Sequence, residues 1–371
     1  MSDGKPPDWA ERQKTDGKDA TREAFEAEGE PMPGPGEETE ADAKARRAEG
    51  FHRAAPPVGD LFAGAVDLML RRADGTAKKV PMPWPAVNEA LGGGLWPGLH
   101  VLTGGTGDGK SQWALQVALH AARAHVPTLY IGLELGHADM VARLLGLMLA
   151  DDGQAPRGVK WSDLYLGKNR DALTYARERY GRAMAELPLW LEVGPPYGWT
   201  ADLLRERALA LREQFPEKDG PGSLPMLVVL DYLQVIASPP KVRQELRERI
   251  GQAAYQGRAV ARDLDAAVLM LSSISREGAG TIRSEREKEK GYEGLGNGDP
   301  GRLVGLGKES GEIEFSADTV MALCQGGFEK DHTEMHLAVA KVRAGTRGWQ
   351  RLDFNGGWFS ADKATGKITE L

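Results

Sequence analysis

Apolar stretches alternate with amphipathic stretches along most of the chain, and this alternation predicts a sheet covered by helices. Five short apolar runs predict buried strands, at 99–103, 128–133, 190–193, 226–231 and 267–271. Helical spacing of apolar residues predicts helices at 111–124, 139–149, 161–187, 200–215 and 246–264. Strands at 319–324, 335–340 and 350–354 are expected to end the domain with a C-terminal β-hairpin. The order of elements predicts an α/β fold, a mostly parallel sheet with helices on both faces.

The first 75 residues do not follow this alternation. Residues 1–55 are rich in Pro, Gly, Ala and Glu, so we expect a disordered acidic tail, either solvated or recognised by a protein partner. Residues 56–75 predict a linker helix with Asp60 as its cap. One side of that helix is apolar, with Leu61, Phe62, Ala65, Leu68 and Met69. A lone helix of this length is marginal, so it should dock on its own domain or on a neighbouring subunit.

Composition and charge narrow the functional classes. The 371 residues suffice for one large α/β domain, and the net charge of −7 argues against a globally basic nucleic-acid binder. Because residues 1–50 hold 14 acidic against 8 basic residues, the rest is close to neutral and can still form a local basic channel. The single cysteine, Cys324, excludes an internal disulfide and fits a reducing cytoplasm. No apolar run is long enough for a membrane span, so we expect a cytoplasmic protein.

One Gly-rich segment between a predicted strand and a predicted helix carries the strongest chemical signal. It fits the phosphate-binding pattern G-x-x-x-x-G-K-[ST]. Its residues are Gly104, Gly105, Thr106, Gly107, Asp108, Gly109, Lys110 and Ser111, and Gln112 follows. Backbone N–H groups and the helix start bind triphosphate, Lys110 reaches the outer phosphates, and the Ser111 hydroxyl ligates Mg²⁺. The alternative is a chance Gly-rich turn, but the flanking strand and helix favour an ATP site.

Two carboxylates end neighbouring apolar strands. Asp231 follows the run at 226–230, where a carboxylate of a phosphate-loop enzyme helps to hold Mg²⁺. Glu134 follows the strand after the loop's helix, at the strand end where α/β sheets bind ligands. It can orient and deprotonate the attacking water. The alternatives are a turn or N-cap carboxylate for Asp231 and a helix-capping acid for Glu134.

Hydrolysis also needs positive charge on the γ-phosphate in the transition state. Lys341 and Arg343 alternate on one predicted strand, so both can face the same side and can serve a neighbour's site. The alternative is a solvated edge strand, where Lys and Arg are common. For polynucleotide contact, the candidates are the segments 241–243 and 277–307. The second mixes basic with acidic residues, which is also typical of a solvated loop. The histidines and the cysteine show no zinc-ligand spacing.

Several blocks, in order and at matching spacing from about 57 to 360, resemble the C-terminal ATPase domain of DnaB-type replicative helicases, in the RecA-like superfamily. Leu95–Gly98 precedes the phosphate loop as in that family, and Gly132–Leu135 resembles its S-L-E-M block. Asp231–Gln234 matches D-Y-L-Q, and Leu271–Arg276 resembles L-S-Q-L-S-R. The remaining matches are Glu309–Gly311 with Ile313-Glu314 and Ala317-Asp318, Lys341–Gly345, and Phe354–Gly356.

The resemblance implies a RecA-like ATPase domain at 76–371 that assembles as a homo-oligomeric ring, usually a hexamer, with ATP at subunit boundaries. It assigns Lys110, Ser111 and Asp231 to ATP and Mg²⁺, and Glu134 to water activation. It makes Arg343, with Lys341, a finger that reaches the neighbour's site. The linker helix would dock on an adjacent subunit. The loops after Asp231 and after Arg276 would grip single-stranded DNA in the central channel.

Three departures from the family pattern shape the functional expectation. Residues 1–55 cannot replace the family's N-terminal helical domain, so we expect that domain to be missing. Ser273 stands where the family has a glutamine that senses the γ-phosphate, and its short hydroxyl is expected to weaken coupling of hydrolysis to translocation. The 277–307 loop is longer than the family's. Together they suggest a specialised relative, for example from a plasmid or phage.

Three functions remain open at this point. The leading one is a Mg²⁺- and ATP-dependent DNA helicase or translocase. The second is a RecA-like ATPase that loads or remodels a protein partner without unwinding DNA. The third is a scaffold whose acidic tail recruits partners and whose ATP site only sets assembly. Stimulation of ATP turnover by single-stranded DNA distinguishes the first from the others.

Overall fold

The structure is a computed structural model that describes ten segments of the chain. These are residues 56–77, 79–156, 158–194, 198–215, 225–237, 243–274, 299–304, 316–328, 333–355 and 357–361. The chain divides between Asp74 and Gly75 into two compact units. The expected tail at 1–55, the 241–242 part of the first polynucleotide segment and most of the 277–307 loop lie outside the described residues.

In the first unit, helix α3 spans Val58–Ala73. It begins after Pro57, whose extended backbone is the N-cap, and no side chain caps it. The expected cap at Asp60 is therefore wrong: Asp60 lies in the first turn, where its charge interacts favourably with the helix dipole. The large apolar side chains of α3, including Leu61, Phe62 and Met69, are exposed. The linker role of residues 56–75 stays a prediction.

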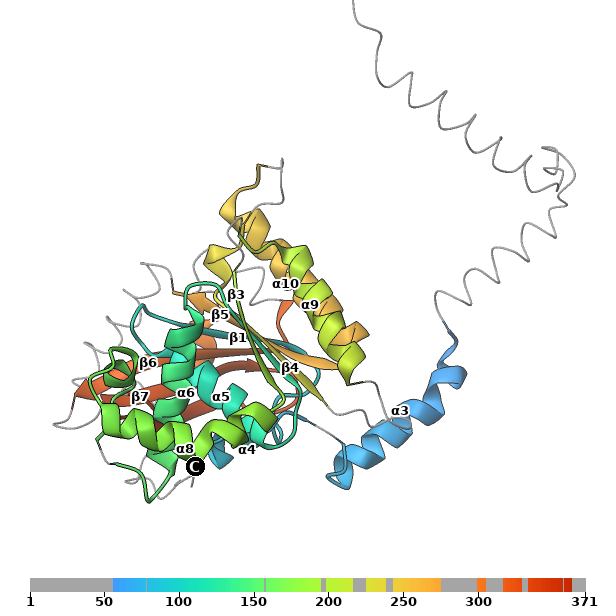
Figure 1. The fold of residues 1–371 in the computed structure, drawn as a ribbon. Helices are drawn as coiled ribbons and strands as arrows, with labels where there is room; N and C mark the ends of the chain where they lie inside the picture. Colours follow the sequence, from blue (N-terminus) through green and yellow to red (C-terminus); the bar gives the residue numbers. More distant parts are fainter. Residues whose placement is uncertain are drawn as a thin grey trace, which may run out of the picture. The chain divides into compact units, whose positions relative to one another are not determined.

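The second unit is built on one nine-stranded sheet with the order β3-β2-β4-β5-β1-β6-β7-β8-β9 (Figure 1). The parallel part consists of β1 (Gly98–Gly104), β2 (Thr128–Gly132), β3 (Leu189–Val193), β4 (Met226–Asp231), β5 (Ala266–Ser273) and β6 (Thr319–Phe328). The antiparallel part continues from β6 with β7 (Thr333–Val342), β8 (Gly348–Phe354) and β9 (Phe359–Ala361). The predicted, mostly parallel sheet is confirmed, and its C-terminal antiparallel part has one strand, β9, that the sequence pattern did not predict.

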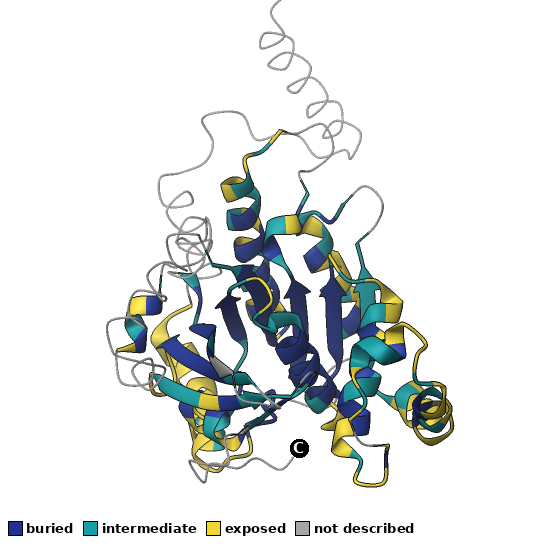
Figure 2. Cartoon of the chain, turned by 90° about the vertical axis from the view of Figure 1, so that its left-hand side faces the viewer, coloured by how far each residue is buried: buried dark blue, intermediate teal, exposed yellow. Residues whose placement is uncertain are grey.

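Helices cover both faces of this sheet (Figure 1). One face packs against α5 (Lys110–Arg123), α6 (His137–Asp151) and α8 (Arg170–Glu186). The other packs against α9 (Ala201–Gln214) and α10 (Leu246–Asp263). The short helices are α4 (Pro85–Ala90), α7 (Trp161–Tyr165) and the 3₁₀ turns Leu233–Val235 and Pro300–Leu303. The central strands are buried along their length, as their apolar runs predict (Figure 2).

The expected single helix at 161–187 is two helices, α7 and α8. Gly167 takes a left-handed conformation, with φ of +67°, which interrupts the helix. Asn169 then caps α8 by accepting a hydrogen bond from the Ala172 N–H at 3.0 Å. The apolar spacing continues through this break, so periodicity alone did not reveal it.

Strand β9 is held by side chains from distant parts of the chain. The buried amide of Gln116 on α5 bonds both ways to Phe359, through Nε2 to the carbonyl and through Oε1 to the N–H, each at 2.8 Å. The indole of Trp84 donates to the same carbonyl at 3.2 Å and stacks on Trp113. These contacts hold the end of the sheet against the helix that follows the phosphate loop.

The close packing of α10 on the sheet gives a stability prediction. A Cβ at Gly257 would lie 2.4 Å from Cε of Met270 and 3.3 Å from Cδ1 of Leu99, both buried. Gly257→Ala should lower the free energy of unfolding by about 1–3 kcal/mol, because the core must shift to admit the methyl group. Chemical denaturation measures the change.

The matched control is Gly181→Ala on α8, where a Cβ would meet nothing within 4 Å. That change should raise the free energy of unfolding by about 0.5–1 kcal/mol, because alanine favours the helix. Equal effects of the two substitutions would contradict the packing described for α10.

Candidate nucleotide-binding site

The phosphate loop connects the end of β1 to the start of α5, as the sequence predicts. Gly107 and Gly109 have φ of +87° and +84°, a conformation that favours glycine. A Cβ at Gly109 would also lie 2.9 Å from Cζ of Phe359, so the loop packs closely on β9. Backbone N–H groups at this turn and at the start of α5 form the kind of anion cradle that phosphate requires.

Polar groups of the loop bond to one another in this structure. The Lys110 ammonium donates to the carbonyls of Gly104 at 2.9 Å and Gly105 at 2.7 Å. The Gly105 N–H donates to a carboxylate oxygen of Asp108 at 2.6 Å. Burial lowers the pKa of Lys110, while the charges of Asp108, Asp231 and Glu134 act in the opposite direction. Burial raises the pKa of Asp108, against the Gly105 bond and the Lys110 charge. A triphosphate would replace the Asp108 carboxylate as the anion that Gly105 and Lys110 serve.

Gln112, the first residue after the motif, is 1% exposed. Its Oε1 accepts a hydrogen bond from Nη1 of Arg143 at 3.4 Å. Its Nε2 has no hydrogen-bond partner among the described residues. A buried amide donor next to Ser111 fits a site that takes an oxygen-rich ligand.

Asp231 ends β4 beside the loop and is 2% exposed. Tyr130 on β2 donates its hydroxyl hydrogen to Oδ2 of Asp231 at 2.6 Å and is 3.3 Å from the carbonyl oxygen of Ser111. Burial raises the pKa of Asp231, whereas hydrogen bonds from Tyr130 and Ser111 and the charge of Lys110 lower it. The structure thus brings Lys110, Ser111 and Asp231 together, as the sequence predicts.

These residues fit a magnesium ion. The hydroxyl of Ser111 and the carboxylate of Asp231 are hard oxygen ligands, which Mg²⁺ prefers along with phosphate oxygens and water. The buried carboxylate of Asp231, with its raised pKa, is an anion that a cation would stabilise. The described residues contain no cluster of three or more His, Cys, Asp or Glu that could hold a metal by itself. An ion at this place would therefore be shared with the nucleotide.

Glu134 lies two residues beyond the end of β2 and is exposed. The expected strand end at Glu134 is wrong, because β2 stops at Gly132, where the backbone pairs with Asp231. Glu134 still acts electrostatically on Lys110, Asp231 and Tyr232, and raises the pKa of each. It is therefore near the loop, on the side of the sheet where the parallel strands end.

Arg343 and Lys341 lie at the opposite end of the central strands from the phosphate loop. Lys341 is in β7, and Arg343 follows its last residue, so the expectation that both belong to the strand is wrong for Arg343. The Arg343 N–H donates to the Asp318 carbonyl at 3.0 Å, and its guanidinium pairs with the Asp318 carboxylate at 3.1 Å. Asp318 in turn accepts from the Leu99 N–H, at the start of β1. The loop is at the other end of β1, about 20 Å away for a seven-residue strand.

Sequence reasoning missed three polar residues of this region: Tyr130, Asp318 and Gln234. The amide of Gln234 donates to the Ser272 hydroxyl at 2.8 Å and accepts from the Ser273 N–H at 3.3 Å. It thus connects the segment after Asp231 to the end of β5. Gln234 and Asp318 stand in the family-like blocks, which was a usable signal, whereas Tyr130 is only a hydroxyl within an apolar strand.

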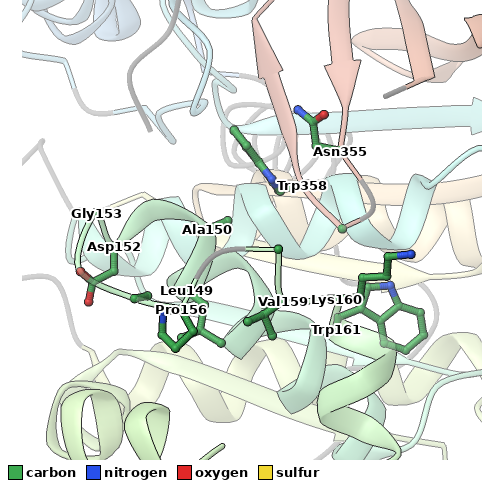
Figure 3. Close-up of a pocket in the computed structure, with 14 residues that line it drawn as sticks. Leu149, Ala150, Asp152, Gly153, Pro156, Val159, Lys160, Trp161, Asn355 and Trp358 are labelled. Atoms are coloured by element: carbon green, nitrogen blue, oxygen red, sulfur yellow. The ribbon is translucent and has the colours of Figure 1, made fainter. Parts of the chain in front are cut away.

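A cavity of about 650 Å³ opens between the end of α6, the start of α7 and the β8–β9 turn (Figure 3). Trp161 lines it from α7, and Asn355 and Trp358 line it from the turn. The guanidinium of Arg143 stacks 3.7 Å from the Trp161 ring centre, on the path to Gln112. None of the residues predicted to bind nucleotide lines this cavity.

A central strand, a Gly-rich loop and a helix, beside a strand that ends in a buried aspartate, define a P-loop nucleoside triphosphatase core of the RecA-like type. The family of DnaB-like helicase C-terminal domains matches residues 84–360, and the chain belongs to that family. The family resemblance drawn from the sequence motifs is therefore confirmed.

Individual relatives agree. The replicative DNA helicase DnaB of Leifsonia xyli subsp. xyli is 28% identical over 296 residues, which are 77% of this chain and 56% of the relative. The DnaB of Geobacillus stearothermophilus is 22% identical over 291 residues, 77% of this chain and 57% of the relative. The chain thus spans a little over half the length of the curated relatives it matches.

Solved structures support the fold. A structure described as an isolated ATPase domain has a TM-score of 0.61 at 19% identity, covering 82% of this chain and 98% of that one. A DnaB-like replicative helicase, described with its interactions with primase, has a TM-score of 0.56 at 21% identity, covering 81% and 66%. In the part of the chain that the structure describes, no helix combines the length and apolar character needed to cross a bilayer.

Proposed function

We propose that the protein is a Mg²⁺- and ATP-dependent DNA helicase or translocase that assembles as a hexameric ring and hydrolyses ATP at subunit boundaries. The placement of Arg343 carries this proposal. It lies at the far end of the strands from the phosphate loop of its own chain, so as a finger it can serve only the site of a neighbour. Membership of the DnaB-like family supports the same reading.

Each residue of the site has a role that follows from its position. Lys110 neutralises charge on the outer phosphates, and the loop N–H groups orient them. Ser111 and Asp231 hold Mg²⁺, which, when bound, supplies positive charge to the phosphates as they transfer. Glu134, exposed and near Lys110, accepts a proton from the attacking water. Arg343 of the adjoining subunit, supported by Lys341, stabilises the transition state.

The single-stranded DNA response tests this function. ATP turnover should rise several-fold on addition of single-stranded DNA, and the stimulation should fall steeply with salt as phosphate contacts are screened. Phosphate release over a salt series, with the DNA-free protein as control, measures it. The Ser273→Gln variant should respond more strongly, because a longer amide can extend the polar link that Gln234 makes to the end of β5.

Other outcomes select other functions. Normal basal turnover without stimulation would instead support an ATPase that remodels or loads a protein partner, including one bound through residues 1–55. Nucleotide binding without turnover would support a scaffold. Either result contradicts the helicase proposal.

A further inference from the structure

Tyr130 is a buried hydroxyl in a strand that otherwise presents apolar side chains to the core. It lies in β2 opposite Val229 of β4, and Gly132 lies opposite Asp231. Because alternate residues of a strand share a face, Val229 and Asp231 point the same way, toward the core that contains Trp113 of α5. Tyr130 is 0% exposed within that core. Its ring packs among apolar side chains, and its hydroxyl reaches the carboxylate.

The phenol bridges the two elements that form the nucleotide site. Its hydroxyl donates to Oδ2 of Asp231 at 2.6 Å and is 3.3 Å from the carbonyl oxygen of Ser111. Asp231 is 2% exposed, so the orientation of its carboxylate depends on the few groups that contact it. A phenol has only one hydrogen to give, and the shorter distance assigns it to the carboxylate.

We propose that Tyr130 is a positioning residue for Mg²⁺, whose phenol holds Oδ2 of Asp231 and leaves Oδ1 for the ion beside the Ser111 hydroxyl. This inference rests on the proposed function. Packing alone does not account for the hydroxyl, because a phenyl ring would fill the same apolar space. Burial and the charge of Asp231 raise the pKa of Tyr130 well above its ordinary value, so the phenol keeps the hydrogen it donates.

The test is the Mg²⁺ dependence of nucleotide binding by Tyr130→Phe, which removes the donor and keeps the ring. A fluorescent ADP analogue is titrated at a series of Mg²⁺ concentrations, without turnover. The Mg²⁺ concentration for half-maximal enhancement of affinity should rise about tenfold, the usual effect of losing a hydrogen bond to a charged group. Affinity without Mg²⁺ should stay within about twofold, because Tyr130 contacts no loop N–H that binds phosphate.

Tyr180→Phe is the matched control. Tyr180 is also buried, and its hydroxyl also contacts a carboxylate and a backbone carbonyl, Oδ2 of Asp152 at 2.8 Å and Met148 at 3.4 Å. These partners line or adjoin the α6 cavity, away from Asp231. The control should show the wild-type Mg²⁺ dependence, and both variants should lose similar thermal stability.

Three results would overturn the inference. They are a wild-type Mg²⁺ dependence in Tyr130→Phe, a loss of metal-free affinity as large as the loss of Mg²⁺ response, and the same Mg²⁺ shift in Tyr180→Phe. If wild type itself binds no nucleotide, the proposed function fails first, which is a distinguishable result. Should Tyr130→Phe not fold, 3-fluorotyrosine at position 130 gives a second measurement. Its ¹⁹F resonance should shift when Mg²⁺ joins bound ADP, whereas the same label at position 180 should not, and an unshifted signal at 130 refutes the role.

Discussion

Replacing Lys110 with alanine should abolish ATP turnover, lowering the rate by at least about 100-fold. The Lys110 ammonium begins α5 and donates to two carbonyls of its own loop, so it is already held beside the cradle. Burial lowers its pKa, which means that the protein holds this charge at some cost in solvation. Loss of the side chain should therefore leave the unfolding temperature unchanged or slightly higher. Phosphate release and thermal unfolding are the two measurements.

Lys160→Ala controls for the loss of one positive charge. Lys160 lines the cavity between α6 and α7, which none of the phosphate-loop residues lines. Its removal should leave turnover within about twofold of wild type. If Lys110→Ala retains a third or more of the wild-type rate, the loop does not bind the transferred phosphate.

Replacing Arg343 with alanine should lower turnover by about 1000-fold while nucleotide affinity stays close to wild type, since a finger acts on the transition state. Arg343 is held by Asp318 at the start of β1, and the loop it would serve belongs to another subunit. Phosphate release gives the first quantity, and equilibrium binding of a fluorescent nucleotide gives the second. Arg347→Ala is the matched control, because Arg347 is also exposed and also paired with an aspartate, Asp299 at 3.4 Å.

Mixing two inactive variants tests whether Arg343 acts on a neighbour. In a ring assembled from equal amounts of Lys110→Ala and Arg343→Ala subunits, about a quarter of the interfaces join an intact loop to an intact arginine. Turnover should therefore reappear on mixing. Wild-type turnover by Arg343→Ala, or full-rate hydrolysis by a protein that stays monomeric with nucleotide, would remove the finger assignment.

Local patterns were enough for the elements that define the fold. The apolar run that ends in Asp231 predicted a buried strand, and β4 has those bounds. The Gly-rich loop predicted a helix start, and α5 begins at Lys110. Such signals work because backbone preference and burial act over a few neighbouring residues. Where local geometry overrides periodicity, as at Gly167 between α7 and α8, the pattern failed. The catalytic roles of Lys110, Glu134, Lys341 and Arg343 stay predictions.

The sequence by itself determined the kind of core, the phosphate loop and the identity of the acidic residue beside it, because each is encoded within one short segment. Only the tertiary structure decided that Tyr130 reaches Asp231, that Gln116 holds β9, and that Arg343 lies at the far end of the strands from its own loop. These facts depend on strand order and register between segments about 100 or more residues apart, which no local pattern encodes. The same register leaves Arg343 at that far end, where only another copy of the chain can use it as a finger.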